Sequence, residues 1–234
     1  MVCEAPRVAR VAPRTDWLDA LPSPNLAGLS PTRRAELAAH WANLGQMEHA
    51  SIAAFARFNL QLLSLGAPAE LIEACNRALA DETRHTKLCF ALASHYGGTD
   101  VGPDRLDLDH CFEDLSLGAI TKLVLEEGCI GETVAALEAL EDAEATTDPV
   151  VRHVLRSIAH DEQTHAELAF KFLRWALTQS SREARAAIAI AAEQSLADYE
   201  RNASSTQACA AQHVVRPLLA ELLQSALNQA VPCA

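Results

Sequence analysis

The sequence contains few aromatic residues and few basic ones, and the basic residues do not gather into a patch. Aromatics make up 5% of the 234 residues, and 19 Lys and Arg stand against 31 Asp and Glu, a formal net charge of −12. Because nucleic acids and anionic membranes attract clustered cations, this balance excludes a general affinity for either. Few aromatics among abundant Ala and Leu favour packed helices over sheets.

Long apolar runs and paired cysteines are also missing from the sequence. No segment approaches the roughly 18 uninterrupted apolar residues of a membrane span. The arginines near the start are not followed by the apolar run of a secretory signal. The seven cysteines are scattered without a Cys-x-x-Cys pair, a pattern typical of reduced thiols. We therefore expect a soluble, cytoplasmic protein.

Proline and glycine separate four long segments rich in Ala and Leu. Ser30 and Asp148 are typical N-caps, each followed by a proline at the first helical position. Gly66 is a typical helix end. Two tight turns and one long connection at 99–114 predict an all-α four-helix bundle with one crossover. The expected helices span about residues 31–66, 68–98, 115–145 and 149–179.

The regions that flank the bundle carry no chemical motif. The N-terminal segment is rich in proline and predicts an extended arm, with Trp17 and Leu18 as anchors. Two further helical stretches follow the bundle, and we expect them to cover one of its faces or to mediate self-association, as in a homodimer. The predicted organisation is an arm at 1–30, a bundle at 31–179 and a helical extension at 180–234.

The motif Asp-Glu-x-x-His occurs twice, as "DETRH" at 81–85 and "DEQTH" at 161–165. A Glu and a His three residues apart project from the same face of a helix. This face is otherwise apolar in both copies, and Glu48 lies in a similar apolar stripe on the first helix. Burying a carboxylate in an apolar stripe costs several kcal/mol of desolvation free energy unless an opposite charge compensates it. Three such helices without a central basic stripe indicate a bound cation.

The third helix offers the remaining acids of this pattern in "LEEGCIGET". Glu127 and Glu132 are five residues apart, so a straight helix cannot present both equally. Glu127 lies 35 residues before Glu162 (162 − 127), close to the 34 between Glu48 and Glu82 (82 − 48), whereas Glu132 lies 30 before it (162 − 132). Equal spans would place the four glutamates at the same height along the bundle. The spacing therefore favours Glu127, with Glu132 as the alternative.

Four elements in this order, "MEHASIAAF", "DETRH", "EEGCIGET" and "DEQTHAEL", resemble the ferritin-like di-iron carboxylate family. The resemblance covers roughly residues 31–178. It implies a ferritin-like bundle in which Glu82 and Glu162 bridge two metal ions, while one Glu and one His complete each ion. The implied ligands are Glu48, Glu82, His85, Glu127 or Glu132, Glu162 and His165, and Asp81 and Asp161 would hold the ring N–H of the histidine on the opposite helix.

The chemistry of this ligand set agrees with the implied metal. Oxygen-rich sites with one imidazole per ion suit iron, or manganese, better than zinc. Four carboxylates also balance the charge of two divalent ions. The sequence therefore predicts two Fe ions per chain, with Mn as the other possibility.

An oxidase or oxygenase is the expected function, with O₂ and a small organic molecule as substrates and an external electron donor. The alternative is iron handling, either ferroxidase activity or storage, in which Fe²⁺ is the substrate. The proline-rich arm argues against assembly into a storage cage. A rubrerythrin-type peroxidase is disfavoured because the Cys-x-x-Cys pair of its rubredoxin module is missing. A metal-free bundle would leave the buried acids unexplained.

Other residues near the motifs have simpler interpretations. His49 and His160 neighbour the motifs but point about 100° or more away from them on a helix. Gly128 and Gly131 interrupt the third helix, and they could leave room for a substrate or a bend. Three cysteines near the motifs are expected to be small buried hydrophobes, Cys75, Cys89 and Cys129.

Overall fold

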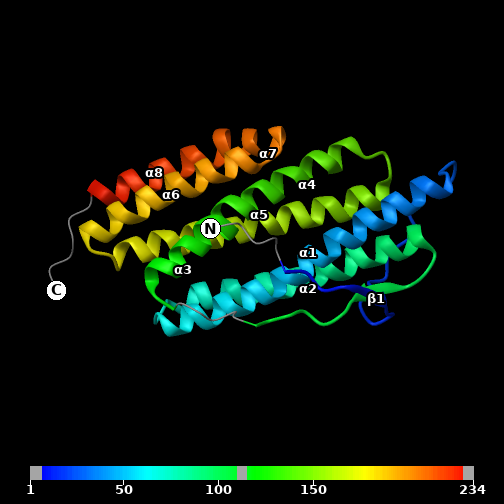
Figure 1. Cartoon of the computed structure of the whole chain (residues 1–234), viewed down its shortest axis with the longest axis horizontal. Coiled ribbons are helices and arrows are strands. Elements are labelled where there is room, and N and C mark those ends of the chain that lie inside the picture. Colours follow the sequence, from blue (N-terminus) through cyan, green and yellow to red (C-terminus); the bar gives the residue numbers. More distant parts are fainter. Residues whose placement is uncertain (1–6, 110–114, 229–234) are drawn as a thin grey trace. The chain divides into compact units, whose positions relative to one another are not determined.

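The computed structural model of the protein describes residues 7–109 and 115–228, and long helices make up most of them (Figure 1). Within these residues the only strands are β1 (Val11–Pro13) and β2 (Val101–Pro103), which pair antiparallel. The all-α expectation is confirmed, whereas the ferritin-like crossover topology stays a prediction. The helices are α1 (Pro31–Ser64), α2 (Ala69–Gly97), α3 (Leu117–Leu123), η1 (Val124–Glu132), α4 (Thr133–Ala145), α5 (Pro149–Thr178), α6 (Arg182–Asn202), α7 (Ser205–Ala210), η2 (Ala211–Val215) and α8 (Arg216–Asn228).

The described residues form two compact units. The first unit contains residues 7–60, 75–109 and 142–158, and the second contains 61–74, 115–141 and 159–228. None of the helices in the described part of the chain is long and apolar enough to span a membrane. The division into arm, bundle and extension stays a prediction from the sequence pattern.

Local signals in the sequence fix the ends of the long helices. The Ser30 hydroxyl accepts a hydrogen bond from the Arg33 amide at 3.1 Å, as an N-cap of α1 does. The Asp148 carboxylate accepts from the Val150 amide at 2.8 Å at the start of α5. Gly66 follows α1 with a φ of +65°, the left-handed conformation that glycine adopts without strain. These three expectations are confirmed.

Helices α1 and α2 pack closely in the first unit. A Cβ on Gly45 would lie 2.9 Å from the Phe90 ring, so only glycine allows this approach. The Cys75 thiol donates to the Phe55 carbonyl at 3.2 Å across the same helix pair. Glu48 lies one turn beyond Gly45, so this packing brings its side chain close to α2.

The N-terminal arm lies against α1 and β2. The Trp17 ring packs edge-on against His49 with 5.1 Å between ring centroids, and its Cβ lies close to Gly102 of β2. The Gln46 amide donates to the Ala9 carbonyl at 2.5 Å. Trp17 is therefore an anchor of the arm, as expected.

The third long segment is helical from Leu117 to Ala145 but is not a regular α-helix. Its central nine residues, η1, form a π-helix, an irregularity at the place where Gly128 and Gly131 interrupt the expected helix. A Cβ on Gly128 would lie 2.6 Å from the Ala169 Cβ of α5. The space left by this glycine is therefore taken by α5 and is not open to a substrate.

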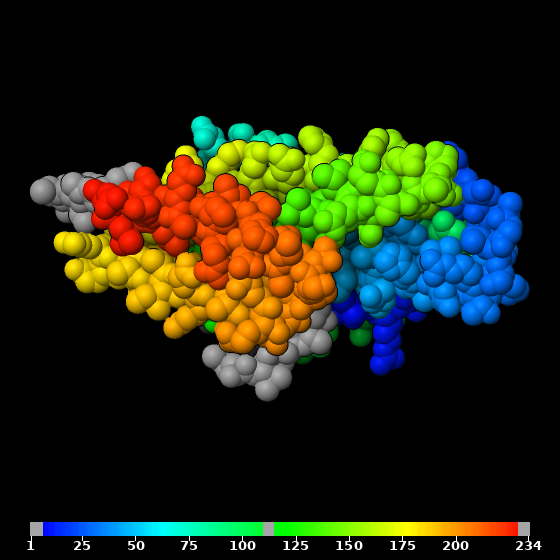
Figure 2. Space-filling model, turned by 90° about the horizontal axis from the view of Figure 1, so that it is seen from above, coloured from blue at the N-terminus to red at the C-terminus, as the bar shows by residue number. Residues whose placement is uncertain are grey.

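Helices α6 and α8 lie side by side in the second unit (Figures 1 and 2). Arg185, at the start of α6, is buried, and its guanidinium donates to the carbonyls of Leu177 at 2.8 Å and Ala226 at 3.0 Å. These carbonyls belong to the last turns of α5 and α8, where backbone acceptors lack helical partners. One buried side chain thus joins three helix ends.

Candidate metal centre

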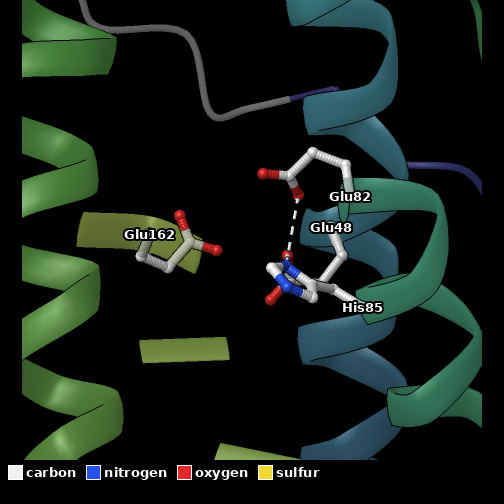
Figure 3. Close-up of side chains that lie close together, drawn as sticks. All are labelled: Glu48, Glu82, His85 and Glu162. Atoms are coloured by element: carbon white, nitrogen blue, oxygen red, sulfur yellow. Dashed lines mark ion pairs between the residues drawn. The ribbon is translucent and has the colours of Figure 1, made fainter. Parts of the chain in front are cut away.

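Glu48 of α1 and Glu82 and His85 of α2 form a cluster in the first unit (Figure 3), here called the α1–α2 cluster. One ligand atom from each residue lies within 4.8 Å of the other two. Nδ1 of His85 is 3.5 Å from Glu48 Oε2 and 3.9 Å from Glu82 Oε2. Glu82 is 1% exposed and His85 is fully buried, whereas the Glu48 side chain is 15% exposed.

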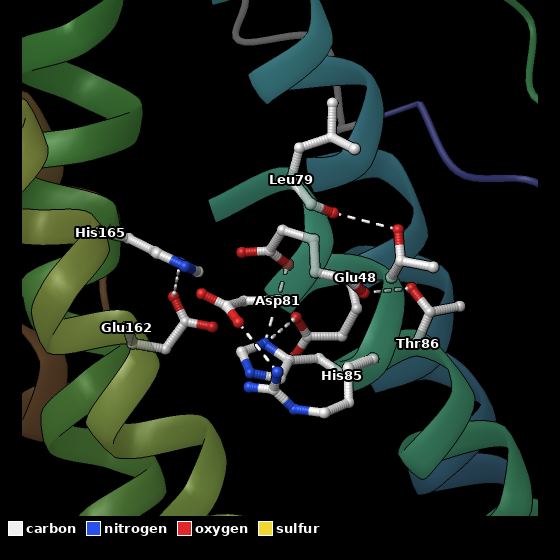
Figure 4. Close-up of polar contacts among 10 residues, drawn as sticks. Glu48, Leu79, Asp81, His85, Thr86, Glu162 and His165 are labelled. Atoms are coloured by element: carbon white, nitrogen blue, oxygen red, sulfur yellow. Dashed lines mark hydrogen bonds and ion pairs between the residues drawn. The ribbon is translucent and has the colours of Figure 1, made fainter. Parts of the chain in front are cut away.

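Glu132 of η1 and Glu162 and His165 of α5 form a second cluster in the second unit, here called the η1–α5 cluster. One ligand atom from each residue again lies within 4.8 Å of the other two. Nδ1 of His165 is 3.3 Å from Glu162 Oε2 (Figure 4). Glu162 and His165 are buried and Glu132 is half-buried. Each cluster thus combines one Glu-x-x-His motif with one Glu from a different helix.

The spacing of the donor atoms suits a metal ion. Two ligands that each lie about 2.0–2.2 Å from one ion are separated by about 3–3.5 Å at tetrahedral or octahedral angles. The measured separations of 3.3, 3.5 and 3.9 Å are at or slightly above this range, so small side-chain movements would suffice. Burial of carboxylates is costly without compensation, and a divalent cation supplies that compensation. The clusters could therefore hold metal ions.

Of the two candidate acids, Glu132 is the one grouped with Glu162 and His165. Glu127 is exposed. The sequence-based preference for Glu127 assumed regular α-helices and compared residue spans across turns. The segment η1 departs from that geometry, because a π-helical segment holds more residues per turn and changes which residues share a face. The choice between Glu127 and Glu132 stays a prediction.

Glu132→Ala should lower the affinity of the protein for Fe²⁺ more than Glu127→Ala, by about tenfold or more. Both variants remove one negative charge from the same helical segment, so long-range electrostatic effects are matched. Titration of Fe²⁺ into the two variants under argon measures the difference. A larger loss of affinity in Glu127→Ala would restore the original assignment.

The aspartates that begin the two motifs and the neighbouring histidines His49 and His160 are not members of the two clusters. Asp81 accepts a hydrogen bond from Arg84 at 2.9 Å, and Asp161 is half-buried. Their predicted contacts with the histidine of the opposite helix stay predictions. His160 is exposed, and His49 packs against the arm.

The buried cysteines near the clusters are poor candidates for metal ligands. Burial raises the pKa of the Cys75 thiol to about 12, and it raises the pKa of the Cys129 thiol further. A thiol binds metal as the thiolate, which such a pKa disfavours at neutral pH. Cys89 is also fully buried. These residues act as small hydrophobes in the core, in line with the sequence-based interpretation.

No known protein family, curated protein or solved structure matches this chain. The resemblance to the ferritin-like family therefore rests on the four sequence motifs. The structure adds an all-helical architecture and buried Glu/His clusters that could hold metal ions.

Proposed function

We propose, from the resemblance of the four motifs to di-iron carboxylate proteins, that the six residues of the two clusters hold a dinuclear iron centre, which activates O₂ for the oxidation of a small organic molecule. The observation that carries this proposal is the matching composition of the clusters, each with a Glu-x-x-His motif and one Glu from another helix. Glu82 and Glu162 hold the same place in their motifs, so they are the natural bridging ligands. Glu48 with His85, and Glu132 with His165, would then complete one ion each.

The donor set matches the charge and chemistry of two divalent ions. Four carboxylates carry the charge that two such ions neutralise, and imidazole suits iron and manganese alike. Bound iron would supply the one-electron chemistry with O₂ that amino-acid side chains lack.

The chain itself would hold the ligands rigidly and exclude water from them. Glu82, His85, Glu162 and His165 are buried, and in such surroundings charge interactions are strong. Glu48 is the more exposed carboxylate of the α1–α2 cluster, so solvent and small molecules would approach that cluster on its side.

Protein reconstituted with Fe²⁺ under argon and then desalted should retain about two Fe ions per chain. The reason is that each of the two matched clusters offers two carboxylates and one imidazole to an ion. Elemental analysis against protein concentration measures the ratio, with Mn²⁺ as a parallel sample. The His85→Ala/His165→Ala double variant, which lacks both imidazoles, is the blank. Fewer than one ion per chain in the wild-type protein would exclude the proposed centre.

Iron handling is the second candidate function, and the net charge of −12 favours it. A strongly acidic surface raises the local concentration of cations such as Fe²⁺. In that case Fe²⁺ would be the substrate of the same centre, and no organic molecule would be needed.

A further inference from the structure

The π-helical segment η1 carries Glu132 at its last residue and needs support from outside the helix. π-Helices are rare and mostly limited to single turns, because their geometry is less favourable than that of an α-helix. Gly128 and Gly131 weaken this segment further, since glycine is a poor helix former. Within the second unit, α3, α5, α6 and η2 contact η1. Two of these four elements, α6 and η2, belong to the C-terminal extension.

Ser195 of α6 makes a polar contact with η1. Its hydroxyl donates a hydrogen bond to Glu126 Oε1 at 2.8 Å, although the two residues are 69 positions apart in the sequence. Ser195 is 6% exposed, so its hydroxyl needs a protein partner. A serine within a helix often bonds to a carbonyl of its own preceding turn. The bond to Glu126 instead ties α6 to η1.

The Glu126 carboxylate is held from two sides. Lys122 Nζ lies 3.8 Å from the same Oε1 atom that accepts from Ser195. A charged acceptor makes the hydrogen bond stronger than one between neutral groups. The side chain of Glu126 thus links η1 to α6.

We propose that Ser195 is a positioning residue for Glu132, and that the C-terminal extension serves to hold η1 in register. The inference rests on the proposed metal centre, for which Glu132 is a ligand. With Glu126 held against α6, the adjacent Glu127 is exposed and Glu132 lies beside Glu162 and His165. The extension therefore selects which acid of "LEEGCIGET" reaches the cluster.

Gln207 of α7 provides a matched control within the same extension. Its side-chain amide donates to Glu138 Oε2 at 3.2 Å, and Glu138 belongs to the regular helix α4. Both bonds join the extension to the third long helical segment. Only the bond of Ser195 acts on the π-helical part.

Hydrogen exchange of the metal-free protein tests, without any metal chemistry, whether Ser195 holds η1 in place. In Ser195→Ala the amides of residues 124–132 should exchange about tenfold faster than in the wild type, while Gln207→Ala should leave them unchanged. The affinity for Fe²⁺ should fall about tenfold in Ser195→Ala and stay within twofold of wild type in Gln207→Ala. Unchanged exchange and affinity in Ser195→Ala would overturn the proposal.

A second pair of variants at Glu126 keeps the test decisive if Ser195→Ala loosens the whole fold. Glu126→Gln keeps an oxygen that accepts from Ser195 and should retain most of the wild-type protection of residues 124–132, whereas Glu126→Leu should exchange as fast as Ser195→Ala. Equal amide exchange at residues 124–132 in the two variants would contradict the proposed role of Ser195. If the wild-type protein bound no iron at all, the proposed function would fail, but the exchange data would still decide whether Ser195 holds η1.

Discussion

Glu82→Gln and Glu162→Gln should each lower the iron content of the reconstituted protein from about two ions per chain to less than one. Each residue is proposed to bind both ions, so one substitution weakens both positions at once. Glutamine is a neutral and weaker ligand than carboxylate, but it has nearly the same size. The metal-free variants should therefore fold, and the loss can be assigned to the centre.

The same substitutions should remove the stabilisation that the metal provides. A ligand at 100 times its Kd stabilises the folded state by about 2.7 kcal/mol, which raises the melting temperature of the wild-type protein. Thermal unfolding with and without Fe²⁺ under argon measures this gain. Glu73→Gln on α2 and Glu167→Gln on α5 are controls, because both residues are exposed on the helices that carry the motifs. An unchanged iron content in Glu82→Gln or Glu162→Gln would show that the bridging assignment is wrong.

Local signals made the helix boundaries predictable. Ser30 with Pro31, and Asp148 with Pro149, act within a few residues of the helix starts that they determine. Glu-x-x-His spacing is equally local, so the sequence identified Glu82 with His85, and Glu162 with His165, as pairs on one face. These pairs form the buried part of each cluster.

Non-local contacts were beyond the reach of the sequence pattern. The pairing of β1 with β2 joins segments about 90 residues apart, and no periodic pattern announces it. The π-helical segment η1 contacts α5 at Gly128 and Ala169 and α6 at Glu126 and Ser195, and these partners are about 40 or more residues away in the sequence. The comparison of residue spans could not take account of such contacts, and its preference for Glu127 over Glu132 stays a prediction. A mid-helix pair of glycines was the only signal of irregularity there.

The reaction with O₂ separates the two candidate functions. Complete reduction of O₂ to water requires four electrons, and two ferrous ions supply two of them. In an oxygenase or oxidase the other two come from a reductant or the organic substrate. In a ferroxidase they come from further Fe²⁺. The two functions therefore differ in which additive sustains the consumption of O₂.

Protein loaded with about two Fe²⁺ per chain should consume O₂ once and then stop, even when excess Fe²⁺ is present. The reason is the burial of Glu82, His85, Glu162 and His165, which favours retention of the bound ions over release of oxidised iron. An oxygen electrode measures uptake as Fe²⁺ is raised, with the His85→Ala/His165→Ala variant as the control for uncatalysed oxidation. Addition of a reductant should restart uptake in the wild type at a rate above that of the control, in which free iron and the reductant also consume O₂. Uptake that grows in proportion to added Fe²⁺, well above the control, would overturn the oxygenase proposal and establish iron oxidation as the activity. The outcome depends on whether the buried ligands retain iron after oxidation, which is the property that distinguishes a resident centre from a transit site.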